Sequence, residues 1–97
     1  TERARGLMDR ATLPESSGMF FVFDISARQA FWNKDTLIPL DVIWISDNKV
    51  IGVSALPKIS DHGIVTVSSP YPVNRVLEVN AGFAVKNNIH IGDTVSE

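Results

Sequence analysis

The sequence predicts a mainly β domain, a small antiparallel β-sandwich or flattened barrel with two short helices. Short segments rich in β-branched and aromatic residues recur along the chain, and such segments fit the pleated surface of a sheet. Gly, Pro, Asn and Asp separate these segments at short intervals, as tight turns require. Only two short segments, near the two ends of the chain, are predicted to be helical.

The first part of the chain combines a helix, a turn and a strand. Residues 1–10 place their apolar side chains at spacings of three and four, which predicts a short helix. Residues 13–18, LPESSG, are typical of a turn. The apolar run MFFVF, residues 19–23, predicts a strand that is buried on both faces.

The middle of the chain predicts a hairpin. Residues 40–46 form a strand with two apolar faces, and Asp41 lies at its start. A short loop at residues 47–49 leads into an antiparallel return over residues 50–56. Gly52 within this return indicates a bulge or the close approach of another segment.

Two further strands follow a loop at residues 58–63. Residues 64–69 predict a weak strand, closed by Pro70, and residues 75–79 predict a stronger one. Strand alternation puts Glu78 on the face opposite to Leu77.

The last part of the chain predicts a helix and a final strand. Asn80 is placed to cap a short helix over residues 81–87, and the asparagines that follow suit a left-handed exit. Residues 89–95 carry a Gly-Asp turn into a last strand.

Length and composition exclude several classes of protein. The 97 residues predict one domain, residues 1–97. The formal net charge is −2, and Lys and Arg are scattered apart from a mild cluster at Arg3, Arg5 and Arg10, which argues against a nucleic-acid partner. No apolar run reaches the ~18 residues of a membrane span. The absence of cysteine excludes disulfides, cysteine-type zinc sites and thiol catalysis.

Catalytic motifs are also missing from the sequence. It contains no G-x-S-x-G, no P-loop, no G-x-G-x-x-G and no HExxH pattern. We therefore expect no catalytic residue, no metal site and no cofactor, although enzymatic activity stays an open question.

The segment FWNKDTLIPLD, residues 31–41, places three charged side chains among apolar ones. A buried carboxylate at Asp41 must find hydrogen-bond donors or lose its charge. In the first alternative, Asp41 stabilises the fold, by accepting backbone N–H bonds or by pairing with Lys34. In the second, it is a pocket carboxylate that binds a ligand or acts as a general base.

Five residues are candidates for a polar binding patch, namely Trp32, Lys34, Asp41, Arg10 and Glu78. A charged rim beside an aromatic face suits a sugar or another amphipathic ligand. The first functional hypothesis is therefore a non-catalytic binding or accessory module for an unknown small molecule or protein. The structural alternative for Glu78 is an ion pair with Arg5 or Arg10.

Two other hypotheses remain open. Asp41, Glu78 and Asp93 could converge on a divalent cation in a carboxylate-based hydrolase. Alternatively, all these residues serve the fold of a structural or interaction domain, with Asp93 bonding the backbone of its own turn.

An ordered series of motifs resembles domain-of-unknown-function family 192. The matching residues are Arg5, Gly6, Leu7, Met8 and Arg10 for RGLMxR; Leu13, Pro14, Gly18, Met19, Phe21 and Phe23 for LPxxxGMLFxF; Phe31, Trp32, Lys34, Thr36, Ile38, Pro39, Leu40 and Asp41 for FWMKNTxIPLD; and Leu77, Glu78, Gly82, Gly92 and Asp93 for the closing LExxAGxxxxxxIxxGD. Asn33 and Asp35 depart from the pattern, where Met and Asn are usual.

The resemblance implies a small mainly β fold and attaches no activity to it. Family members tend to carry a strand before the opening helix, and this sequence begins at that helix, so the upstream edge strand is expected to be absent. Many members follow a signal or membrane anchor, which suggests a location outside the cytoplasm.

Overall fold

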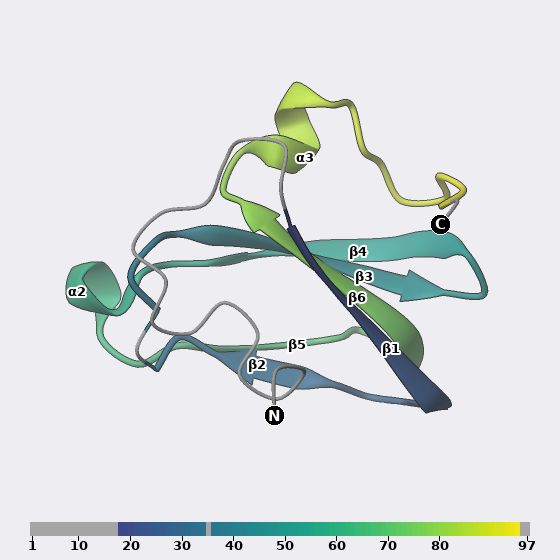
Figure 1. The fold of residues 1–97 in the computed structure, drawn as a ribbon, viewed down its shortest axis with the longest axis horizontal. Coiled ribbons are helices and arrows are strands. Elements are labelled where there is room, and N and C mark those ends of the chain that lie inside the picture. Colours follow the sequence, from purple (N-terminus) through teal and green to yellow (C-terminus); the bar gives the residue numbers. More distant parts are fainter. Residues whose placement is uncertain (1–17, 35, 96–97) are drawn as a thin grey trace.

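The computed structural model describes residues 18–34 and 36–95, which form two antiparallel sheets that do not close into a barrel (Figure 1). The main sheet has the strand order β1, β6, β3, β4, with bounds β1 (Gly18–Ala27), β6 (Val73–Asn80), β3 (Leu40–Ser46) and β4 (Lys49–Leu56). The second sheet pairs β2 (Ala30–Trp32) with β5 (Thr66–Ser68). The mainly β fold class is confirmed.

The elements form three layers in Figure 1, with the second sheet below the main sheet and α3 (Phe83–Lys86) above it. A second short helix, α2 (Ile59–His62), connects β4 to β5. None of the helices in the described part of the chain is long and apolar enough to span a membrane.

Strand β3 lies at the centre and supplies both cores. One face of β3 packs Val42 and Trp44 with Phe21 of β1, and Phe31 of the second sheet covers them. The other face packs Ile43 and Ile45 in a second cluster, beneath α3 and the C-terminal segment. This double burial explains why the strand carries apolar residues at both alternating positions.

The predicted β3–β4 hairpin is confirmed, and its turn is one residue shorter than the predicted loop over residues 47–49. Ser46 pairs with Lys49, so the turn contains two residues, Asp47 (φ 49°) and Asn48 (φ 64°), whose positive φ angles match the twist of the strands. The register shifts between Trp44 and Ile45, and a Cβ on Gly52 would lie 3.3 Å from both Trp44 Cδ1 and Pro70 Cγ.

The described structure corrects two predictions about the strands and adds one strand that was not predicted. Phe21 of β1 is buried, but Phe20 is 37% exposed, so β1 is not buried on both faces. The sequence did not predict β2, although its residues pair directly with β5. The expected strand over residues 89–95 is reduced, within the described residues, to one bridge between Lys49 and Thr94, because this segment arches over the sheet.

The predicted helices also differ from the observed ones. The segment 58–63 contains α2 rather than only a loop, whereas the expected helix over residues 1–10 lies outside the described residues. The helix after β6 is confirmed as α3, but its N-cap is Gly82 (φ 89°) and not Asn80. Asn88 (φ 54°) supplies the left-handed exit.

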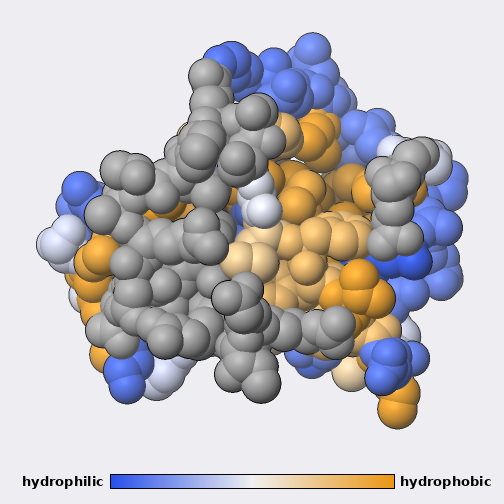
Figure 2. Space-filling model, viewed as in Figure 1, coloured by the Kyte–Doolittle hydropathy of each residue, from blue (hydrophilic) through white to orange (hydrophobic). Residues whose placement is uncertain are grey.

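Figure 2 shows hydrophobic residues in the middle of this face of the molecule. They lie below the hydrophilic residues at the position of α3. On the α3 side of the main sheet, Phe20 and Val53 are 37% and 39% exposed.

Candidate functional site

The five candidate patch residues do not form one site. Val42 pairs with Glu78 and Asp41 pairs with Val79 across β3 and β6. Paired residues in a sheet share a face and neighbours alternate. Asp41 and Glu78 therefore point to opposite faces of the main sheet, and no single cleft contains both. Arg10 lies outside the described residues.

Asp41 serves the fold by binding the start of α3. Its carboxylate is 8% exposed, and Oδ2 accepts hydrogen bonds from the backbone N–H groups of Gly82 (3.2 Å) and Ala84 (3.1 Å). These are two of the N–H groups that a helix cannot satisfy internally. The first alternative for Asp41, acceptance of backbone N–H bonds, describes the observed geometry.

Glu78 is buried on the other face of the sheet, at 4% exposure. Its cross-strand neighbours there are Met19 of β1 and Val42 of β3. The predicted partners Arg5 and Arg10 lie outside the described residues, so the ion pair stays a prediction.

The carboxylates do not converge on a cation. Asp93 Oδ2 accepts the N–H of His90 at 2.7 Å, which is the turn geometry expected for a Gly-Asp pair. Across residues 18–34 and 36–95, no three His, Asp or Glu side chains are grouped to hold a metal ion. The arrangement of Asp41, Glu78 and Asp93 as one metal site is therefore wrong.

Trp32 and Lys34 do lie together, on the outer surface of the second sheet. Phe31 points toward the core, so its neighbour Trp32 points outward, with 48% of its surface exposed. The Nζ of Lys34 lies 5.4 Å from the centroid of the Trp32 ring, within the range of a cation–π contact. Thr66 pairs with Trp32, so its exposed hydroxyl shares the outer face.

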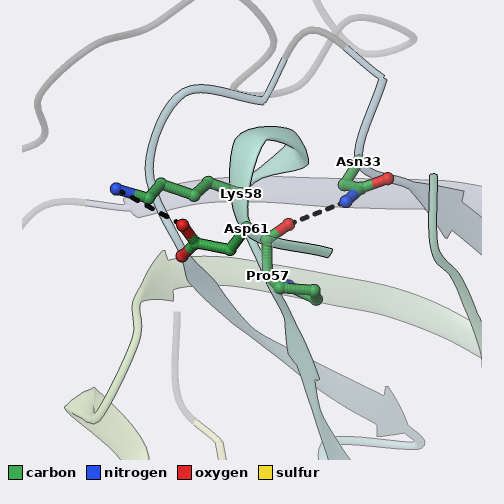
Figure 3. Close-up of polar contacts among 4 residues, drawn as sticks. All are labelled: Asn33, Pro57, Lys58 and Asp61. Atoms are coloured by element: carbon green, nitrogen blue, oxygen red, sulfur yellow. Dashed lines mark hydrogen bonds and ion pairs between the residues drawn. The ribbon is translucent and has the colours of Figure 1, made fainter. Parts of the chain in front are cut away.

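Asn33, which was not among the predicted site residues, holds this region in place. It is fully buried, and its Nδ2 donates to the carbonyl oxygen of Pro57 at 3.0 Å, as Figure 3 shows. The same Nδ2 donates to the carbonyl oxygen of Gly63 at 2.8 Å. Its Oδ1 accepts the N–H of Val65 at 2.7 Å. The only signal in the sequence was a polar amide where the family pattern has Met.

A depression of about 490 Å³ lies beside the Asn33 contacts, where β3 begins and β4 ends. Among the described residues that line it, Asp61 is the one charged residue, and Lys58 pairs with it at 3.9 Å, as Figure 3 shows. The remaining lining residues are Pro39, Leu40, Ala55, Leu56, Pro57, Val65 and Ala81.

The sequence and the fold of this chain resemble those of known proteins. The model of the DUF192 family, described as uncharacterized ACR, matches residues 1–97. The chain belongs to the DUF192 family. A search of curated proteins gave no match.

Two crystal structures resemble this DUF192 chain. A protein of unknown function from Novosphingobium aromaticivorans DSM 12444 is 33% identical with a TM-score of 0.88, and the match covers 99% of this chain and 68% of that one. A protein from Sinorhizobium meliloti 1021, described as "a putative transcription regulator", is 32% identical with a TM-score of 0.83, covering 96% and 71%. The resemblance to family 192 is confirmed, and the family description assigns no activity.

Proposed function

We propose that this DUF192 chain is a non-catalytic binding module that holds a sugar-containing ligand on the outer face of β2 and β5. The observation that carries the proposal is the exposure of Trp32. Trp44 is completely buried, as expected for a large aromatic residue, whereas Trp32 is 48% exposed. An exposed aromatic face with polar neighbours is a common recipe for recognition of an amphipathic ligand.

The Trp32 platform is held in position before any ligand binds. Trp32 itself pairs with Thr66 in the second sheet. At the next residue, the backbone N–H of Asn33 donates to the carbonyl oxygen of Val65 at 3.0 Å. The side chain of Asn33 adds three hydrogen bonds to the same loop. A platform that is already ordered loses little conformational entropy on binding, which favours affinity.

The polar groups around Trp32 suit the hydroxyl or carboxylate groups of a sugar. Lys34 provides a mobile ammonium group over the ring, and Thr66 and Ser68 provide hydroxyls on the same face. The apolar face of a sugar ring can stack on the indole while its polar edge meets these groups. Asp41 takes no part in this site, because it points to the α3 side of the main sheet. Glu78 is buried on the inner face of the main sheet (4% exposed), whereas Trp32 lies on the outer face of the second sheet.

A nucleic-acid ligand is not part of the proposal. The description of the Sinorhizobium protein applies to that protein alone. In this chain the net charge is −2, and Arg28, Lys49 and Arg75 lie on different strands or connections rather than in a row. Phosphate tracking requires a continuous basic surface.

A fluorescence titration with neutral and uronic-acid oligosaccharides tests the proposal. Ligand binding is expected to change the emission of Trp32 and to raise the melting temperature, since a ligand at 100 times its Kd adds about 2.7 kcal/mol of stability. Trp32→Ala is expected to abolish both effects while leaving the fold intact. Tyr71→Ala is the matched control, because Tyr71 is an exposed aromatic residue (66%) elsewhere on the chain.

Lys34→Met separates the two kinds of sugar. It is expected to weaken binding of uronic acids more than binding of neutral sugars, because it removes the cation that lies over the ring. Full binding by Trp32→Ala, or no response to the whole panel, would show that the proposed function is wrong.

A further inference from the structure

Ile64 is an exposed apolar residue beside the Trp32 platform, with 66% of its surface accessible. Trp32 pairs with Thr66 in the second sheet. One residue further along, Asn33 N–H donates to Val65 O at 3.0 Å, so the pairing continues beyond the ends of the two strands. Ile64 is the next residue, and alternation places its side chain on the outer face, on the same side as Thr66. Ile64 therefore extends the surface that carries Trp32.

The backbone of Ile64 is held on both sides by one buried side chain. Asn33 Nδ2 donates to the carbonyl oxygen of Gly63 at 2.8 Å, and Asn33 Oδ1 accepts the N–H of Val65 at 2.7 Å. A single exposed apolar residue is ordinary on a protein surface and indicates no site by itself. An exposed apolar residue that is fixed next to an exposed tryptophan is a better binding surface, because little ordering remains to be done when a ligand arrives.

The spacing between Trp32 and Ile64 limits what can contact both. Residues that are diagonal neighbours across two antiparallel strands lie roughly 7–8 Å apart. A sugar ring that stacks on the indole covers the first residue, and a short substituent that projects sideways from the ring is needed to reach the second. The sugar is therefore expected to carry a substituent larger than a hydroxyl group.

This substituent has to be apolar at its tip and polar nearer the ring. Ile64 offers an apolar contact, whereas the ammonium group of Lys34, 5.4 Å from the centroid of the Trp32 ring, offers hydrogen-bond donors. An acetamido group meets both requirements, since its methyl group can pack on Ile64 while its carbonyl oxygen accepts a hydrogen bond from Lys34. A hydroxyl group at the same position can make only the polar contact.

We infer that the outer face of β2 and β5 prefers sugars with an acetamido group, with the ring on Trp32 and the acetyl methyl group on Ile64. The inference rests on the proposed sugar-binding function and names the class of sugar. Burial of one methyl group favours binding by about fourfold. A charge-assisted hydrogen bond adds to this, so an acetamido sugar is expected to bind about tenfold more tightly than its hydroxyl counterpart.

A comparison of N,N′-diacetylchitobiose with cellobiose tests the inference, because the two disaccharides share one linkage and differ at the acetamido position. In ¹H–¹⁵N spectra of the whole chain, the acetamido sugar is expected to shift the indole N–H of Trp32 and the amide of Ile64. The indole of Trp44 is the internal control, since it is buried and its Nε1–H donates to Ser54 Oγ at 2.9 Å. Titration of the Trp32 signal gives both affinities.

Ile64→Ala assigns the apolar contact. It is expected to lower the affinity for N,N′-diacetylchitobiose about fourfold and to leave cellobiose binding unchanged. Ile25→Ala is the matched control, because Ile25 is an exposed isoleucine (78%) of β1, outside the second sheet. Urea midpoints verify that each variant is folded, and Ile64→Thr, which keeps the branched side chain, is used if Ile64→Ala is not.

The possible failures are distinguishable. Equal binding of the two disaccharides would overturn the inference and leave the proposed function in place, and so would a tenfold preference that persists in Ile64→Ala. Binding of other sugars but of neither disaccharide would likewise contradict the inference alone. If no sugar of any kind shifts the Trp32 signal, the proposed function is wrong, and the inference is wrong with it.

Discussion

Two buried polar side chains, Asn33 and Asp41, are stabilised by hydrogen bonds with backbone groups. The side chain of Asn33 hydrogen-bonds with two carbonyl oxygens and one N–H group of the loop that contains α2. It thereby supplies partners to backbone groups that have none in a sheet. Buried backbone groups must be paired somewhere, and a single amide with two donors and one acceptor is well suited to this loop. Asn33 therefore fixes the loop beside the Trp32 platform.

Asn33→Ala is expected to destabilise the protein by about 3 kcal/mol, because it removes three hydrogen bonds made by a side chain that is 0% exposed. Urea unfolding measures the change. Asn74→Ala is the matched control, since the buried Oδ1 of Asn74 has no hydrogen-bond partner among the described residues. Equal losses in the two variants would contradict the role given to the Asn33 bonds.

At the scale of the elements, α3 is joined to β3 through a side chain from outside the helix. The helix has only four residues, and its N-cap Gly82 provides no side-chain bond. A helix this short is not stable by itself. Asp41 supplies the missing acceptor, and Ala81 N–H donates to Pro39 O at 3.1 Å beside it.

Asp41→Ala is expected to cost about 1–2 kcal/mol, the usual effect of losing a capping acceptor. Asp41→Asn is expected to cost less, because its amide oxygen can still accept from Gly82 and Ala84. Chemical denaturation ranks the variants, with the exposed Asp24→Ala as control. If Asn is as harmful as Ala, the charge of Asp41 matters more than its hydrogen bonds.

At the scale of the whole molecule, the two sheets share one aromatic core. The ring of Phe31 lies 5.2 Å from that of Phe21 and 5.8 Å from that of Trp44, measured between centroids. The strands of the second sheet have three residues each, and an isolated pair of that size is not stable in water. The second sheet therefore depends on the main sheet.

The two sheets are expected to unfold in one cooperative transition. Trp32→Phe leaves Trp44 as a probe of the core, and Trp44→Phe leaves Trp32 as a probe of the second sheet. In each variant, the fluorescence midpoint in urea should coincide with the midpoint of that variant's own far-UV circular dichroism. A Trp32 signal that changes at lower urea than the dichroism would show that the second sheet opens separately.

The central elements were predictable because their signals are local. Two-faced burial of β3, the Asp47–Asn48 turn and the close approach at Gly52 each follow from residue types within a few positions. The sequence also placed Trp32 in the candidate binding patch, and the structure shows that Trp32 is exposed. Strand β2 was missed because three residues are too few to show a period.

The amino-acid sequence by itself determined the mainly β class, the family and the residues that had to find polar partners. Only the tertiary structure decided which groups are the hydrogen-bond partners of these residues. Strand pairing sets Asp41 and Glu78 on opposite faces, and it brings Asp41 to a helix about forty residues away. A polar side chain needs a hydrogen-bond partner because it is buried, and burial follows from the local sequence pattern. Which group becomes the partner depends on strand register and on the packing of layers, because these bring distant segments together.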